Sequence, residues 1–126
     1  MIDIMEALYA FWSQFGVPAY AEDMVPDDAK LPYIRYSVAK APVAQASIMT
    51  AYNYHNARLM GNVERARLAE QIAEAIPEGG AKLPLKNGGY IVLRRGPDFQ
   101  TLYQDPDARD VIGIRTSVEG YFFTHL

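Results

Sequence analysis

The chain has 126 residues, a formal net charge of -3, 50% hydrophobic and 21% charged residues, and no cysteine. A chain of this length is typical of one domain, here residues 1–126, whose core needs no disulfide or metal. The missing cysteines exclude a disulfide framework, a thiolate metal site and a cysteine nucleophile. The acidic balance argues against a broad attraction for nucleic acid.

The first six residues, Met-Ile-Asp-Ile-Met-Glu, place acidic side chains where a signal peptide would carry basic ones. No stretch approaches the roughly 20 apolar residues that a membrane span needs. We therefore expect a soluble protein of the cytoplasm with no membrane partner.

The first expected element is an amphipathic helix. Asp3 and Glu6 form a capping-box pattern at its start, and Gly16 with Pro18 ends it. Apolar residues recur at helical spacing along one face, namely Ile4, Leu8, Phe11, Trp12 and Phe15. A helix with so apolar a face should pack across a sheet.

Strand patterns follow this helix. Residues 17–20 are a candidate short strand, and residues 22–30 have the proline and aspartate content of a solvated loop. Residues 33–39 alternate apolar with polar or aromatic side chains, and residues 47–55 alternate again. The two alternating segments predict a long antiparallel hairpin.

A second helix is marked by its ends, with Asn62 as the N-cap and Pro77 as the stop. Its expected inner face carries Leu68, Ala69, Ile72, Ala75 and Ile76. Two glycine pairs follow, on either side of residues 82–85, and they indicate turns.

The last third of the chain predicts two more strands. Residues 90–94 form the first, residues 96–98 (Gly-Pro-Asp) break it, and residues 99–104 should form a helical turn. Residues 111–123 form a long closing strand. Its expected inner face holds Ile112, Ile114, Thr116, Val118 and Phe122, and its outer face holds Arg115, Ser117, Glu119 and Tyr121.

This order of elements predicts an α+β fold: an antiparallel β-sheet of about four strands with two main helices packed on one face. Residues 40–46 and 96–108 are rich in small, proline, glycine or aspartate residues and carry few apolar anchors. We therefore expect both segments to be mobile loops before assembly.

The sequence offers little for catalysis. Two histidines, His55 and His125, are too few for a zinc site, and the glycines lack a phosphate-loop signature. We expect no enzymatic activity, no cofactor and no metal. An enzyme would have to gather four loop carboxylates in one cleft, namely Asp27, Asp28, Asp105 and Asp107.

One stretch carries a family resemblance: Leu31-Pro32-Tyr33-Ile34-Arg35-Tyr36-Ser37-Val38. With the opening helix and the proline/aspartate loop before it, and the strand, helix and aromatic closing strand after it, the chain resembles tail-terminator and tail-completion (neck) proteins of tailed bacteriophages and prophages. The resemblance spans nearly the whole chain as a pattern of segments.

The resemblance implies a homo-oligomeric ring, typically hexameric, without enzymatic activity. Such a ring caps the tail tube and joins it to the head connector proteins. Genome DNA passes through its lumen without sequence-specific binding. The resemblance also implies that the protein resides in the tail and neck of the virion, and in the host cytoplasm before assembly.

A ring needs two different surfaces that match each other. One candidate surface is the outer face of the long strands and the other is the region around residues 94–107. The residues that we expect at these subunit or partner interfaces are Tyr52, Tyr54, Arg94, Arg95, Phe99, Tyr103, Arg115 and Tyr121.

Two alternatives remain open at this point. A head-completion or minor tail protein of the same neck region would have a similar sequence pattern. A small cytoplasmic ligand-binding domain could use the aromatic-rich sheet face as its pocket.

Overall fold

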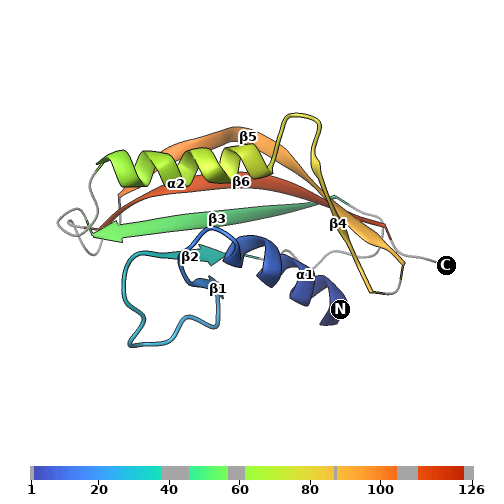
Figure 1. Cartoon of the computed structure of the whole chain (residues 1–126), viewed down its shortest axis with the longest axis horizontal. Coiled ribbons are helices and arrows are strands. Elements are labelled where there is room, and N and C mark those ends of the chain that lie inside the picture. Colours follow the sequence, from blue (N-terminus) through green and yellow to red (C-terminus); the bar gives the residue numbers. More distant parts are fainter. Residues whose placement is uncertain (1, 38–45, 57–61, 87, 105–110, 124–126) are drawn as a thin grey trace.

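The computed structural model describes residues 2–37, 46–56, 62–86, 88–104 and 111–123. One six-stranded sheet runs in the order β1-β2-β3-β6-β5-β4 (Figure 1). β1 pairs with β2 in parallel, and every other pairing is antiparallel. The elements are α1 (Ile2–Ser13), β1 (Ala19–Ala21), β2 (Tyr33–Tyr36), β3 (Ala46–Asn56), α2 (Asn62–Ala75), β4 (Ala81–Pro84), β5 (Tyr90–Gln104) and β6 (Val111–Phe123).

Both helices lie on the same face of the sheet (Figure 1), so the predicted α+β architecture is confirmed. The apolar stripes of the two helices and the inward residues of the strands bury one another in a single core cluster. Trp12 of α1 is fully buried, and its ring stacks on Tyr36 of β2 with 6.3 Å between centroids. Within the described residues, neither helix has the length and hydropathy needed to cross a bilayer.

The strand alternation predicted from the sequence is largely observed. β2 and β3 form the expected antiparallel hairpin, with Tyr36 opposite Ala51. On β6, Thr116, Val118 and Phe122 are buried, as predicted for the inner face. α1 begins at Ile2, so the predicted N-cap, Asp3, lies inside the first turn instead.

The sheet has more strands than predicted because short elements join both of its edges. β1 corresponds to the candidate strand at residues 17–20 and pairs with β2. β4 occupies the segment between the two glycine pairs, which was predicted only as a connection between turns. Gly80 and Gly88 adopt φ values of 91° and 92°, a region that glycine tolerates, and they reverse the chain before and after β4.

The predicted break at residues 96–98 and the helical turn at 99–104 are wrong. β5 continues to Gln104 through a β-bulge, where the register with β6 shifts between Arg95 and Gln100. Gly96 fits this bulge because a Cβ atom there would lie 2.7 Å from the Oγ of Ser117 on β6. Residues 96–104 are therefore strand rather than loop, while residues 40–45 and 105–108 of the predicted mobile loops lie outside the described residues.

Candidate interaction surfaces

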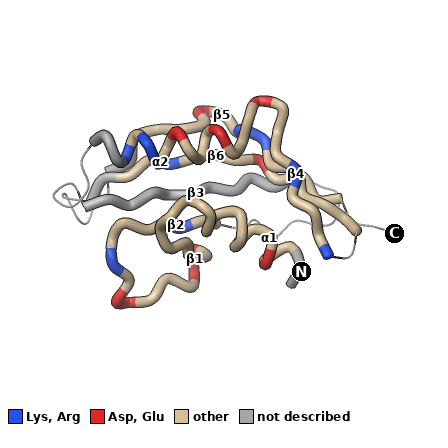
Figure 2. Tube along the Cα trace, viewed as in Figure 1, with Lys and Arg blue, Asp and Glu red and all other residues tan. Residues whose placement is uncertain are grey.

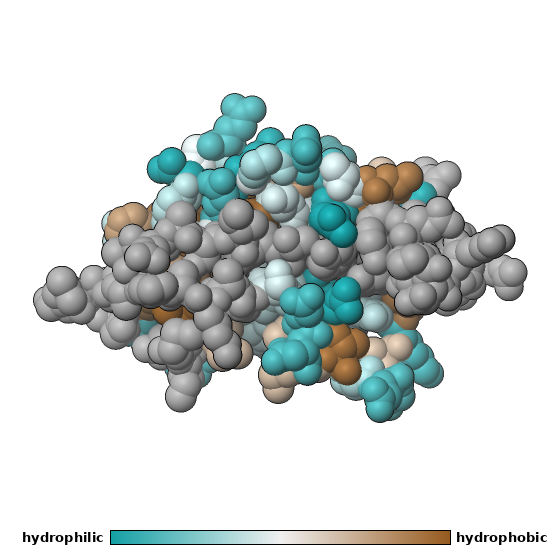
Figure 3. Space-filling model, turned by 180° about the vertical axis from the view of Figure 1, so that it is seen from behind, coloured by the Kyte–Doolittle hydropathy of each residue, from teal (hydrophilic) through white to brown (hydrophobic). Residues whose placement is uncertain are grey.

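The face of the sheet that carries no helix is rich in aromatic and basic side chains. Besides smaller side chains such as Val92 and Ser117, strand alternation places ten described aromatic or charged residues there, namely Tyr20, Tyr33, Arg35, Lys82, Tyr90, Arg94, Arg115, Glu119, Tyr121 and Phe123. Four of these ten are cationic and one is anionic, whereas the whole chain carries a net charge of -3. Figure 3 views this face, where hydrophilic side chains line the upper margin and hydrophobic groups form separate patches, one of them near the lower centre.

For three of the predicted interface residues, the structure describes the backbone pairing in the sheet but not the side chain. Tyr52 of β3 pairs with Arg115 of β6. Tyr54 of β3 and Tyr103 of β5 both pair with Gly113, from opposite sides of β6. The side chains of these three tyrosines lie outside the described part of the structure.

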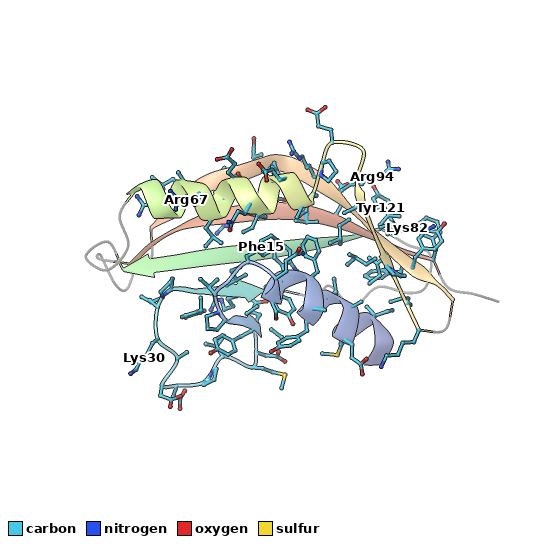
Figure 4. The ribbon with its side chains drawn as sticks, in the orientation of Figure 1. Phe15, Lys30, Arg67, Lys82, Arg94 and Tyr121 are labelled. Atoms are coloured by element: carbon cyan, nitrogen blue, oxygen red, sulfur yellow. The ribbon has the colours of Figure 1, made fainter. Side chains whose placement is uncertain are left out.

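A basic-aromatic cluster forms at one end of the helix-free face, made of Lys82, Tyr90, Arg94, Tyr121 and Phe123. Figure 4 labels three of these residues, Lys82, Arg94 and Tyr121, near β4. The rings of Tyr90 and Phe123 stack with 4.9 Å between centroids. Lys82 Nζ lies 4.1 Å above the Tyr90 ring, and the Arg94 guanidinium lies 5.5 Å from the Tyr121 ring. Four of these residues line a hollow of about 320 Å³.

The electrostatics of this cluster are set partly by Glu119. The hydroxyl of Tyr121 donates a hydrogen bond of 2.8 Å to Glu119 Oε2. That bond, together with the negative charge of Glu119, raises the pKa of Tyr121 above its ordinary value. Tyr121 is therefore a neutral donor at physiological pH, and Glu119 lies opposite Arg94 in the ladder.

The neighbouring arginine, Arg95, points to the opposite face and binds the C-terminal end of α2. Its Nε donates to the carbonyl of Ile76 at 2.6 Å, and one of its terminal nitrogens donates to the carbonyl of Ala73 at 2.9 Å. Its guanidinium also lies 4.6 Å from the ring of Phe99. The last turn of α2 contains no basic residue, so Arg95 supplies the positive charge that a helix C-terminus favours. Arg95 and Phe99, both predicted at an interface, thus contact each other, and Arg95 also bonds to the end of α2 in the same chain.

A second surface, which the sequence did not predict, lies along β1 and α1. An apolar hollow of about 350 Å³ is lined by Met5, Glu6, Tyr9, Ala19, Tyr20, Ala21, Met24 and Tyr36. Met5, Tyr9 and Met24 are 45%, 57% and 67% exposed, which is high for large apolar side chains. The sequence carries a partial signal, because Met5 and Tyr9 are four residues apart and off the buried stripe of the helix. Their packing beside the alanines of β1 cannot be read from either segment alone.

Carboxylates accompany this apolar hollow. The segment after β1 exposes Glu22, Asp23, Asp27 and Asp28 against one base, Lys30. Figure 2 shows these acidic positions beside β1 and along the loop that follows, with basic positions around β4 and the adjacent part of β5. We call Met5, Tyr9, Glu22, Asp23 and Met24 together the acidic edge.

A metal site needs several ligating side chains close together. No group of three or more histidine, cysteine, aspartate or glutamate side chains gathers within the ranges that the structure describes. Asp27 and Asp28 lie in the loop after β1. Asp105 and Asp107, the other two carboxylates that an enzyme would have to gather, lie outside the described residues.

No protein-family model, no curated protein and no solved structure matches the chain. What the protein does is therefore inferred from its own surfaces.

Proposed function

We propose that the chain is a structural assembly protein that forms a homo-oligomeric ring, as tail-terminator and tail-completion proteins of tailed bacteriophages do. The observation that carries the proposal is the presence of two unlike surfaces on one small domain. One is a basic, aromatic face of the sheet without helices, and the other is an acidic, apolar edge. Closed rings are built from heterologous contacts, in which two different surfaces of each subunit match.

In this proposal the ring, a hexamer by family resemblance, caps a tail tube and presents a docking surface to head connector proteins. DNA passes through the lumen without being recognised by sequence. The protein resides in the virion neck, and in the host cytoplasm before assembly. A head-completion or minor tail protein of the same neck would use the same two surfaces. The proposal assigns no catalytic residue, cofactor or metal.

Size-exclusion chromatography with light scattering, over a concentration series, tests this proposal. The expected result is a species of several subunits whose fraction grows with concentration and whose mass reaches a plateau. A plateau distinguishes a closed ring from an open filament, which would keep growing. A single-subunit mass at every concentration would contradict the proposal.

A second function, a small ligand-binding domain, is favoured by one observation. The hollow beside β1 is almost entirely apolar in its lining and has a volume of about 350 Å³, within the range of small-molecule sites. It lies on the helix side of the sheet edge rather than on the aromatic face. This function would be favoured if the protein is a monomer whose melting temperature rises with a small apolar ligand, and if Ala21→Trp, which fills the hollow, abolishes that rise.

A further inference from the structure

We infer that the acidic edge of one copy docks on the basic-aromatic cluster of a second copy, and that this contact propagates the assembly. The inference rests on the proposed self-assembly and adds which surfaces meet. Three properties of the two surfaces lead to it: their charges, their exposed apolar groups and their positions in the sheet.

The charges of the two surfaces are opposite. The acidic edge carries Glu22 and Asp23, and the loop that continues from it exposes Asp27 and Asp28 against one base, Lys30. The cluster presents Lys82 and Arg94, both exposed, above aromatic rings. These two cations outnumber the one carboxylate beside them, Glu119, which accepts the hydrogen bond from Tyr121. Opposite charges on two surfaces speed their encounter and fix their orientation, and they penalise contact between like surfaces. This pattern favours contact between the acidic edge and the cluster over contact of either surface with itself.

The apolar groups are also complementary. Met24 is 67% exposed and directly follows Asp23, so an apolar anchor sits beside the charges. The cluster offers a hollow of about 320 Å³ lined by Tyr90, Tyr121 and Phe123. A thioether fits irregular spaces and makes favourable contacts with aromatic rings. In return, the hollow at the acidic edge can receive Phe123, which is 41% exposed.

The positions of the surfaces make the contact heterologous. Within the acidic edge, Glu22, Asp23 and Met24 directly follow β1, whereas the cluster adjoins β4, and these two strands form the opposite edges of the sheet. On the β4 edge, Lys82 and Pro84 are exposed, and both residue types discourage the addition of another strand. Docking there is therefore through side chains. A contact between opposite edges leaves one surface of each kind unused on every pair, so it continues until the ring closes.

Two charge-reversed variants of the full chain test the inference. Lys82→Glu/Arg94→Glu makes the cluster acidic, and Glu22→Lys/Asp23→Lys makes the acidic edge basic. Each variant alone places like charges across the contact, so we expect the concentration at half assembly to rise on the order of tenfold or more. A mixture of the two should restore assembly, because each altered surface then meets its altered complement. Misfolding could not produce such a rescue.

A charge control and a matched pair of apolar variants accompany these charge-reversed variants. Arg67→Glu/Glu70→Lys reverses two exposed charges on α2, outside both surfaces, and should leave assembly unchanged. Met24→Ser should weaken assembly on the order of tenfold, because an exposed anchor at the centre of an interface contributes much of its affinity. Leu102→Ser, which alters a residue that is 73% exposed outside both surfaces, should not.

The outcomes separate this inference from the proposed function. If the wild type assembles but either charge-reversed variant assembles equally well, the docking inference is wrong and the proposed function stands. If the wild type is a monomer at every concentration, the proposed function fails, and the docking inference that rests on it fails with it. If the wild type binds a single-stranded DNA oligonucleotide, and Lys82→Glu/Arg94→Glu removes that binding while assembly is unchanged, the cluster is a nucleic-acid surface and the inference is overturned.

Discussion

Replacing Arg95 should destabilise the fold far more than replacing Arg94, although the two are adjacent. Arg95→Ala removes two hydrogen bonds from a cation to backbone carbonyls of α2, at 2.6 and 2.9 Å. Hydrogen bonds to charged groups contribute roughly 1.5–3 kcal/mol each, and the contact with an aromatic ring adds about 0.5–1 kcal/mol. These terms share one side chain and are not additive, so we expect a loss of about 3 kcal/mol.

Urea unfolding measures this loss. Trp12 is the only tryptophan and is fully buried, so its fluorescence reports the loss of the core. With an m-value of about 2 kcal/mol/M, a loss of about 3 kcal/mol lowers the urea midpoint by about 1.5 M. The measurement belongs at a protein concentration where light scattering gives a single species, because assembly would add to the apparent stability.

The matched control is Arg94→Ala. Its side chain is exposed on the other face of β5, so the change should stay within about 0.5 kcal/mol. Arg95→Lys keeps the positive charge near the end of α2 but loses the two-point geometry, so it should recover part of the stability. If Arg95→Ala costs no more than Arg94→Ala, Arg95 does not hold α2 to the sheet, and the reasoning is refuted.

Three further predictions concern the fold. Leu93→Ala removes a fully buried side chain and should cost about 2–5 kcal/mol in urea unfolding, against less than about 0.5 kcal/mol for the exposed Leu102→Ala; equal losses would contradict the assigned core. Gly96→Ala places a Cβ atom 2.7 Å from Ser117 Oγ and should cost about 1–3 kcal/mol, with partial recovery in the double variant with Ser117→Ala; no loss would mean that the bulge does not pack closely on β6. Burial raises the pKa of Tyr36, so the folded state keeps this phenol neutral at pH values where the unfolded chain ionises it. The stability that this shift contributes is present below the unfolded pKa of about 10 and is lost as the pH rises through the folded pKa. Tyr36→Phe should therefore make unfolding free energy less dependent on pH above about 10, and an unchanged dependence would argue against the burial.

The helices and long strands could be predicted because their signals are local. The inward stripe of α1, with Leu8 and Trp12, and the alternation of β6, with Val118 and Phe122, both follow from spacing alone. The same alternation places Arg94 and Tyr121 on the face without helices. In each strand, the residues predicted to be buried therefore also showed which alternate residues lie on the face without helices.

The remaining features depend on contacts between distant segments. Residues 96–98 contain the local signals of a strand end, but they form a bulge in which Gly96 packs closely on Ser117 of the neighbouring strand. The role of Arg95 depends on carbonyls 19 and 22 positions earlier in the chain. The hollow at the acidic edge exists because α1 packs beside the small residues of β1, an arrangement that spacing within either segment does not reveal.

Negative-stain imaging of the wild-type protein, above the concentration at which light scattering detects assembly, tests the central claim most directly. Two unlike surfaces at opposite edges of the sheet predict closed rings of one subunit number with a central opening. Class averages that show only compact two-fold dimers, or only single subunits, would contradict the account.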